Sequence, residues 1–196
     1  MNICLIRHGE TDWNNSGKWQ GREDIPLNPN GILQSRHCGV ALSSQKWKAI
    51  TTSPLLRAKQ TAGIIAGVLN IREVYEDIDL IERDLGKASG STPKERAALF
   101  PDGKYEGSEN LELLRTRVYN AVLRSSEKFC PGNIIIVSHG AAINSLLALL
   151  SNDVIGTGKT RLKNACISML KYENQAFNIV FYNKDCDEIN GLLSFN

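Results

Sequence analysis

The sequence predicts an α/β fold with three layers, in which helices cover both faces of a mostly parallel central sheet. Two short apolar runs, Ile3–Ile6 and Asn133–Ser138, are typical of strands buried on both faces. Segments of helical length follow them, and this alternation favours a parallel sheet between two helical layers. The 196 residues suit one domain, which we expect to span residues 1–196.

Caps and turn residues predict the elements between and after these strands. A strand over Ala49–Thr52 leads into Ser53 and Pro54, where the serine can cap a helix and the proline suits its first position. Arg57 would then lie in the first turns of that helix. Helices are expected over Pro29–Leu42, Pro54–Leu69, Asn110–Phe129 and Ala141–Leu150.

Two regions have weaker patterns. Residues 84–109 are rich in glycine, proline and charge, with weak periodicity only around residues 94–100, which indicates a small lid or crossover segment. Near the C-terminus, Ala165–Tyr172 and Phe177–Tyr182 flank a polar turn and predict a hairpin. We expect the remaining Asp185–Asn196 to be a polar tail without a defined structure.

The composition excludes several classes of protein. Hydrophobic residues at 42% and charged residues at 22% are globular values. Lys and Arg total 23 against 21 Asp and Glu, with no long block of one sign, which argues against nucleic-acid and membrane partners. Five scattered cysteines without a CxxC pair indicate reduced thiols, and no apolar run approaches the ~20 residues that span a bilayer. We therefore expect a soluble, cytoplasmic protein.

Two of the three histidines directly follow the predicted buried strands. Arg7 and His8 stand at the end of one strand and His139 at the end of the other, and a glycine follows each histidine. Open α/β sheets bind ligands at the carboxyl ends of their strands. Arg7 offers a planar guanidinium suited to phosphate or carboxylate, and Arg57 supplies a second one. The pattern predicts an anion-binding rim that carries two histidines.

Metal and nucleotide sites are the competing interpretations. The chain has no HExxH motif, no paired cysteines and no third histidine near the other two, so we expect no metal and no other cofactor. His37 is predicted to lie mid-helix without a role. Residues 156–160 resemble the end of a P-loop, but Asp153 replaces its first glycine and the segment follows a helix. We therefore predict a plain loop there, with the basic residues of 159–163 solvated.

The run Leu5–Asn14, Leu-Ile-Arg-His-Gly-Glu-Thr-Asp-Trp-Asn, resembles the signature of the histidine phosphatase superfamily, which is also called the phosphoglycerate mutase-like family. Other blocks resemble the same family in the same order and cover most of the chain: Gln20–Gly21, Leu27–Gly31, Ser53–Thr61, Glu82–Gly86, Val137–Gly140 and Asn164–Ser168. The resemblance implies the phosphoglycerate mutase-like fold. It also implies a phosphohistidine mechanism, in which a histidine attacks phosphorus and water later hydrolyses the N–P bond.

The resemblance also implies a role for each matching residue. His8 would be the nucleophile, and Glu82 would protonate the leaving oxygen. The implied phosphoryl-binding residues are Arg7, Asn14, Gln20, Arg57 and His139, the last of which is also expected to be catalytic. A neutral imidazole is a competent nucleophile when its other nitrogen donates to a fixed acceptor, which we expect for His8. To carry a proton near neutral pH, Glu82 would need burial or a neighbouring anion such as the substrate phosphate.

The reaction type and the substrate are less constrained. We expect a metal-independent phosphomonoesterase acting on a small phosphorylated metabolite, because residues 84–109 are short and lack the paired arginines of the family's mutases. The alternatives are a cofactor-dependent phosphoglycerate mutase and a non-catalytic protein that binds phospholigands. Candidate contacts to the leaving group are Lys18, Arg22, Lys87, Lys94, Arg96 and Tyr105. A strand edge or the hairpin could support a homodimer, although nothing in the sequence requires one.

Overall fold

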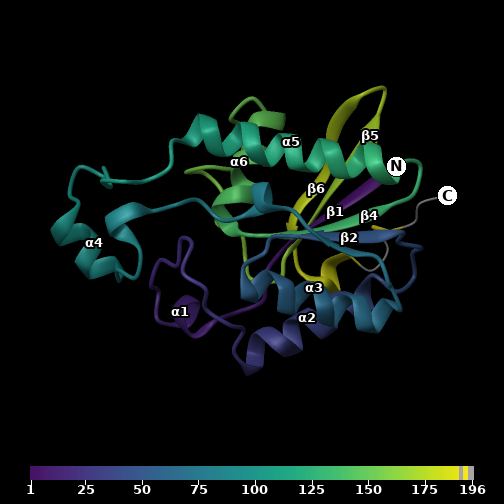
Figure 1. Cartoon of the computed structure of the whole chain (residues 1–196), viewed down its shortest axis with the longest axis horizontal. Helices are drawn as coiled ribbons and strands as arrows, with labels where there is room; N and C mark the ends of the chain where they lie inside the picture. The colour runs from purple at the N-terminus through teal and green to yellow at the C-terminus, as the bar shows by residue number, and fades with distance from the viewer. Residues whose placement is uncertain (190–191, 194–196) are drawn as a thin grey trace.

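The computed structural model describes residues 1–189 and 192–193, which fold around a six-stranded sheet of order β3-β2-β4-β1-β5-β6 (Figure 1). The strands are β1 (Asn2–Arg7), β2 (Ala49–Thr52), β3 (Val74–Glu76), β4 (Ile134–Ser138), β5 (Ile167–Glu173) and β6 (Ala176–Lys184). The first four run parallel, whereas β5 pairs antiparallel with β1, and β6 pairs antiparallel with β5. The mostly parallel sheet is confirmed, and the predicted hairpin is the β5–β6 pair that extends it.

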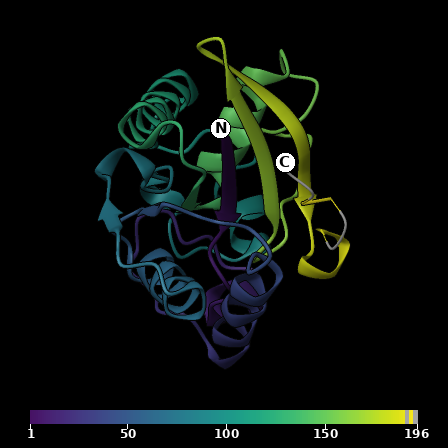
Figure 2. The same ribbon diagram turned by 90° about the vertical axis from the view of Figure 1, so that its right-hand side faces the viewer.

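Helices cover both faces of this sheet. The helices are α1 (Asp12–Asn15), α2 (Pro29–Ala41), α3 (Leu56–Leu69), α4 (Pro93–Leu99), α5 (Leu111–Phe129) and α6 (Gly140–Leu150), with 3₁₀ turns η1 (Ile78–Leu80), η2 (Gly86–Ala88) and η3 (Cys186–Ile189). Figure 1 shows α5 and α6 over one face and α2 and α3 over the other, and the turned view in Figure 2 shows the same two pairs on opposite sides of the strands. The predicted three-layer arrangement is therefore confirmed.

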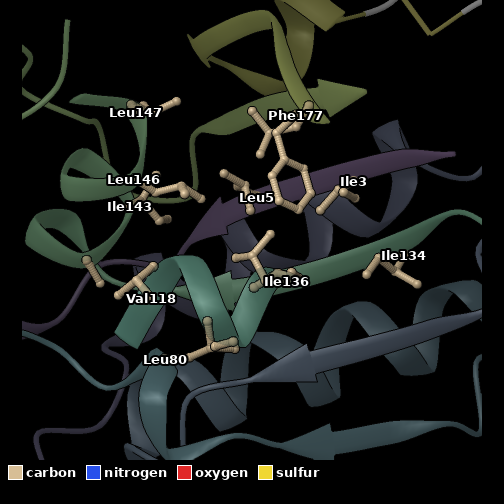
Figure 3. Close-up of a cluster of buried hydrophobic side chains, with 14 of the residues drawn as sticks. Ile3, Leu5, Leu80, Val118, Ile134, Ile136, Ile143, Leu146, Leu147 and Phe177 are labelled. Carbon is tan, nitrogen blue, oxygen red and sulfur yellow. The ribbon is translucent and has the colours of Figure 1, made fainter. Parts of the chain in front are cut away.

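The alternation of side chains along the strands builds one core on each face. On β1, Ile3 and Leu5 belong to a cluster that also contains residues of α5 and α6, whereas Cys4 and Ile6 belong to a cluster with residues of α2 and α3. Figure 3 shows the first cluster, in which side chains of β1 and β4 gather with those of α5 and α6. Burial on both faces explains why these runs are apolar throughout.

The structure contains elements that the sequence pattern does not indicate. The three-residue strand β3 exposes Val74 and Glu76, so no apolar run marks it. The expectation of an unstructured tail over Asp185–Asn196 is wrong for its described part, because it contains η3 and buries Ile189 and Leu193 in the cluster on the α2–α3 side. Single apolar residues in a polar segment show no periodicity, so only the tertiary contact identifies them. Residues 190–191 and 194–196 of this tail lie outside the described residues.

Residues 84–109 form a loop-rich excursion that contains η2 and α4. It closes on itself through an isolated bridge between Leu85 and Ser108. Gly86 has a φ of 51°, and a Cβ there would lie 2.0 Å from the carbonyl oxygen of Glu106, so this crossing requires glycine. In Figure 1 this excursion carries α4 away from the sheet. Its movement as a lid stays a prediction.

The strand register positions the candidate residues. β1 pairs with β4 so that Arg7 lies beside Ser138, and His8 and His139 therefore follow at the same level. The parallel pairing of β2 with β4 brings Ser53, the residue after β2, to the same edge. The carboxyl ends of three parallel strands thus form the rim expected for a ligand site.

Candidate active site

A cavity of about 950 Å³ opens at this rim. It is lined by seven of the predicted site residues, namely Arg7, His8, Asn14, Lys18, Gln20, Glu82 and Arg96. Arg57 and His139 do not line it and are almost completely buried, with 1% and 0% of their surface exposed. The ring centroid of His139 nevertheless lies 5.2 Å from that of His8. The two histidines predicted for the rim are therefore neighbours.

His8 follows β1 and is 2% exposed. Its Nδ1 lies 2.7 Å from the carbonyl oxygen of Gly9, and because a carbonyl only accepts, Nδ1 carries the proton. Nε2 then keeps its lone pair. Burial lowers the pKa of His8 well below the usual value, and the positive charges of Arg57 and Arg7 lower it further. His8 is therefore a neutral imidazole at pH 7, with Nε2 available as a nucleophile.

His139 is the N-cap residue of α6, and its Nε2 lies 2.7 Å from Oγ of Ser53. The Ser53 hydroxyl also accepts the backbone N–H of Leu55 at 3.3 Å, so it is placed to donate its own proton to Nε2. We therefore assign the ring proton of His139 to Nδ1. Burial, followed by the charge of Arg57, lowers the pKa of His139 well below its usual value. This ring is a neutral donor.

The two predicted arginines are held by backbone carbonyl groups. Nη1 of Arg7 donates to the carbonyl of Leu162 at 2.6 Å, and the guanidinium of Arg57 donates to those of Glu23 and Gly21 at 2.6 and 2.8 Å. Burial lowers the pKa of Arg7 and lowers that of Arg57 to about 10. Both therefore stay charged at neutral pH. No carboxylate in the described residues forms an ion pair with either, so their charge is left for a ligand.

Unpartnered buried atoms converge on this region. Within residues 1–189 and 192–193, seven buried side-chain nitrogen or oxygen atoms have no hydrogen-bond partner. Five of them belong to the rim or to the cavity wall: Nε of Arg7, Oε1 of Gln20, Nε of Arg57, Nδ1 of His139 and Oδ1 of Asn144. Such atoms are rare in folded proteins and ask for an explanation. A polar ligand in the cavity supplies one.

Glu82 faces the cavity and is tied to the start of α6. Its carboxylate accepts the backbone N–H groups of Ala141 and Ala142 at 3.1 and 3.0 Å, and that of Arg83 at 2.9 Å. Since α6 begins immediately after His139, one helix start positions both Glu82 and His139. These contacts fix the position of the Glu82 carboxylate at the cavity.

Asn14 and Gln20 come from the loop after β1. The oxygen of the Asn14 amide accepts the backbone N–H of Thr11 at 3.2 Å in a capping box that forms α1, and also the side-chain amide of Asn164 at 3.0 Å. These contacts leave the nitrogen of the Asn14 amide as the group to donate to a ligand. Gln20 is buried, and its Oε1 faces no donor in the described part of the chain.

Six side chains were predicted to contact the leaving group, and the structure places only some of them at the cavity. Two line the cavity, Lys18 and Arg96. Four are not among the described residues that line it: Arg22, Lys87, Lys94 and Tyr105. Arg22 instead pairs with Glu109 at 3.5 Å, and Lys87 forms an exposed ion pair with Glu106. The structure therefore brings only part of the predicted basic set to the cavity.

Other residues of the site were not predicted. Ser53 orients His139, although its sequence context indicated only a helix cap. The side-chain amide of Asn164 donates to the carbonyl of His8 at 3.2 Å and so links the start of β5 to the loop after β1. Arg83 and the loop 157–163 also line the cavity. Asn164 and Arg83 lie within the motifs noted above, but a single sequence does not reveal which motif residues face a ligand.

The remaining predictions concern metals, membranes and the third histidine. Among the described residues, no group of three or more His, Cys, Asp or Glu side chains is placed to hold a metal ion. None of the helices described is long and apolar enough to cross a membrane. His37 is exposed on α2. The expectations of metal independence and a cytoplasmic location stay predictions.

Comparison with known proteins places this chain in a family. The family model described as histidine phosphatase superfamily (branch 1) matches residues 3–185. The chain is 41% identical over 181 residues to the uncharacterized phosphatase PhoE of Bacillus subtilis (strain 168). The aligned region covers 92% of this chain and 93% of PhoE. It is 33% identical over 189 residues to the probable phosphoglycerate mutase GpmB of Proteus mirabilis, with coverage of 89% and 86%.

The fold is shared with solved structures. A phosphoserine phosphatase from Entamoeba histolytica, solved in complex with phosphoserine, matches with a TM-score of 0.81 and 28% identity and covers 93% of this chain and 96% of that one. The expected phosphoglycerate mutase-like fold is therefore confirmed. The chain, with its two rim histidines and its cationic cavity, belongs to the histidine phosphatase superfamily.

Proposed function

We propose that the protein is a metal-independent phosphomonoesterase that hydrolyses a small phosphorylated metabolite through a phosphohistidine on His8. The observation that carries this proposal is the hydrogen bond from Nδ1 of His8 to the carbonyl of Gly9 at 2.7 Å. It leaves the lone pair on Nε2, in a neutral ring beside Arg7 and Arg57. A neutral nucleophile and a cationic cradle are what phosphoryl transfer to histidine needs.

The proposed cycle has two steps. In the first, Nε2 of His8 bonds to phosphorus while the bond from phosphorus to the leaving oxygen breaks, and Glu82 gives a proton to that oxygen. In the second, a water oxygen bonds to phosphorus, the N–P bond breaks, and Glu82 takes the proton from the water. An ester and water thus become an alcohol and phosphate. The guanidinium groups of Arg7 and Arg57 and Nδ1–H of His139 would stabilise the charge on the equatorial oxygens.

Glu82 acts as an acid in this proposal only after substrate has bound. Its carboxylate is held at the start of α6 by three backbone N–H groups. A phosphoryl dianion placed beside it favours the protonated form, because two negative charges at close range repel one another.

The named relatives support hydrolysis as the reaction. PhoE is described as a phosphatase, and the protein from Entamoeba histolytica is a phosphoserine phosphatase. A phosphoglycerate mutase is the second candidate, because GpmB is described as a probable one. Against it, of the basic residues in 84–109 only Arg96 lines the cavity, and its Nη1 donates to the carbonyl of Ser91. A mutase must hold its released product while phosphate returns, and residues 84–109, which lack the paired arginines of the family's mutases, bring a single cation to the cavity.

The test is phosphate release from p-nitrophenyl phosphate and a panel of phosphorylated metabolites in the presence of EDTA. Wild type should be active, His8→Ala should be inactive, and His37→Ala, which removes the exposed third histidine, should match wild type. Activity that depends on a metal or survives in His8→Ala would contradict the proposal. Isomerisation of phosphoglycerate that requires 2,3-bisphosphoglycerate would establish the mutase instead. Folded wild type that binds phosphate compounds but turns over none would be a binding protein.

A further inference from the structure

The loop after α6 forms one wall of the cavity. Residues 157–164 all line it, although the sequence predicted only a loop with solvated basic residues. The P-loop resemblance of 156–160 does not extend to the structure, because this segment follows a helix and forms turns without a helix of its own. Its position beside the phosphoryl site suggests a different role for its charges.

The loop is held in one conformation by contacts with α6. Gly156 has a φ of 96°, and a Cβ there would lie 2.3 Å from the carbonyl oxygen of Asn144 in α6. The side chain of Asn144 donates to the carbonyl of Thr160 at 2.8 Å, and Thr160 in turn receives the backbone N–H of Gly156 on its hydroxyl at 3.0 Å. The residues that follow Thr160 therefore emerge from a fixed point on the cavity wall.

The three cationic side chains of this loop differ in what they contact. Nζ of Lys159 donates to the backbone carbonyl of Asp153, and Lys163 forms an ion pair with Asp185. The guanidinium of Arg161 makes neither an ion pair nor a hydrogen bond with any residue that the structure describes, although its own carbonyl accepts the Asn183 side chain at 3.2 Å. Arg161 thus has a fixed backbone and an uncommitted charge.

Arg161 lies close to the phosphoryl site. The carbonyl of its neighbour Leu162 accepts Nη1 of Arg7 at 2.6 Å. Arg7 and Arg161 both line the cavity. Burial lowers the pKa of Arg7, and the positive charge of Arg161 contributes to that lowering. Like charges placed together in a cavity wall are unfavourable unless an anion lies between or beside them.

The cavity carries more positive charge than a single phosphoryl group accounts for. Seven of the described lining residues are Lys or Arg, and Glu82 is the one carboxylate among them. Arg7 and the buried Arg57 would bind the phosphoryl group. Arg161 lines the same cavity, which must also hold the rest of the substrate, and its guanidinium has no partner among the described residues. A guanidinium there suits a carboxylate or a second phosphate, which it can bind with two parallel N–H donors.

We propose that Arg161 binds a second anionic group on the leaving group, so that the preferred substrates are small phosphomonoesters that also carry a carboxylate or a second phosphate. This inference rests on the proposed phosphatase function. Arg161 takes no part in the chemical step, and its contribution is to substrate binding. Its removal therefore raises KM for substrates with the second anion and leaves the others unchanged.

The test compares substrates that differ only in the second anion. The pairs are 3-phosphoglycerate with glycerol 3-phosphate, and fructose 1,6-bisphosphate with fructose 6-phosphate. Arg161→Gln should lower kcat/KM for the doubly anionic member of at least one pair by about tenfold or more, mainly through KM, and change its partner by less than about twofold. Arg161→Lys, which keeps the charge, should recover part of the loss. The pair that responds identifies the second anion as carboxylate or phosphate.

The control is Arg36→Gln, which removes an exposed guanidinium from α2 and should leave all four substrates unaffected. Equal losses on both members of each pair, or no loss on any, would overturn the role of Arg161. If wild type hydrolyses none of the four, calorimetric binding of 3-phosphoglycerate and fructose 1,6-bisphosphate to wild type and Arg161→Gln decides the point. Binding weakened by the substitution would then uphold the anion site while contradicting the phosphatase. Binding that is absent or equal would reject the anion site.

Discussion

His8 and His139 occupy equivalent places in the fold but present opposite ring nitrogens to a ligand. Each follows a buried parallel strand, each precedes a glycine, and burial lowers the pKa of each. Nδ1 of His8 donates to the carbonyl of Gly9, which leaves an unprotonated Nε2. Nε2 of His139 instead meets the Ser53 hydroxyl, which leaves a protonated Nδ1. One ring therefore presents an acceptor nitrogen to a ligand, and the other presents a donor.

The difference comes from neighbours that are distant in sequence. A Cβ on Gly9 would lie 2.4 Å from the carbonyl oxygen of Gly31, so the loop after β1 packs directly against the start of α2. That packing fixes the position of the Gly9 carbonyl, which accepts the hydrogen bond from Nδ1 of His8. The partner of His139 is Ser53, which directly follows a third strand, β2, and lies 86 residues earlier in the chain. Two similar sequence motifs therefore acquire different chemistry from their surroundings.

The largest expected effect separates the attacking ring from the donating one. Rapid quenching with a ³²P-labelled substrate should trap an acid-labile phosphohistidine on wild type and on His139→Asn, but not on His8→Asn. His8→Asn should lose at least about 10⁴-fold in kcat, because no other group forms the N–P bond. His139→Asn should lose about 10²–10³-fold, the usual cost of one charge-stabilising donor. Label on His8→Asn would reverse the two roles.

A smaller effect tests the serine that sets the tautomer of His139. Ser53→Ala should lower kcat/KM by roughly tenfold, because the imidazole proton is then no longer directed to Nδ1. The matched control is Ser138→Ala, since that hydroxyl is equally buried but donates to the carbonyl of Leu80 at 2.7 Å. Both variants should lose about 1 kcal/mol of stability, and only Ser53→Ala should lose activity. Equal activity in the two variants would remove Ser53 from the site.

The smallest effect is shared by both rings and appears in stability. A histidine in the unfolded chain titrates near pH 6.5, whereas burial lowers the pKa of His8 and His139 in the folded protein. Below about pH 6.5 the unfolded state therefore binds more protons. The free energy of unfolding should fall as pH decreases through this range, by up to about 1.4 kcal/mol per pH unit for each ring.

Urea unfolding at several pH values between about 5 and 8 measures this dependence. Replacement of either buried histidine by asparagine should reduce the slope by about half, because one titrating group is removed. His37→Asn should leave it unchanged, since His37 is exposed on α2. A flat profile in wild type would mean that the two rings accept protons in the folded state.

Much of the fold could be predicted from local pattern. The runs that became β1 and β4 are apolar throughout because helices cover both faces. The helix that carries Arg57 was predicted, but its predicted start was wrong: α3 begins at Leu56 after the N-cap residue Leu55, without a side-chain cap. The exposed strand β3 and the buried Ile189 could not be predicted, because neither belongs to a periodic apolar segment.

The candidate site could be predicted in part. Motif resemblance pointed to His8, Arg57 and Glu82, and the structure brings them to one edge. Lys87 had the right charge for the cavity, but it pairs with Glu106 outside it. The charge of a side chain can be read from a sequence, whereas its partner depends on how distant segments pack. Arg161 is exposed, as predicted, but only the structure places it on the cavity wall.

By itself, the sequence determined the strands, the helices that cover them and the placement of two histidines at the carboxyl ends of parallel strands. These follow from local forces: apolar burial, caps and turn residues act between near neighbours in the chain. Only the tertiary structure decided which nitrogen of each ring carries the proton, and which cations remain free for a ligand. For His139 the proton is placed by a hydrogen bond from Ser53, far away in sequence. For His8 the acceptor is the neighbouring Gly9 carbonyl, whose backbone packs against the distant Gly31. Hydrogen bonds act over about 3 Å, so they are decided only when the folded chain brings the partners together.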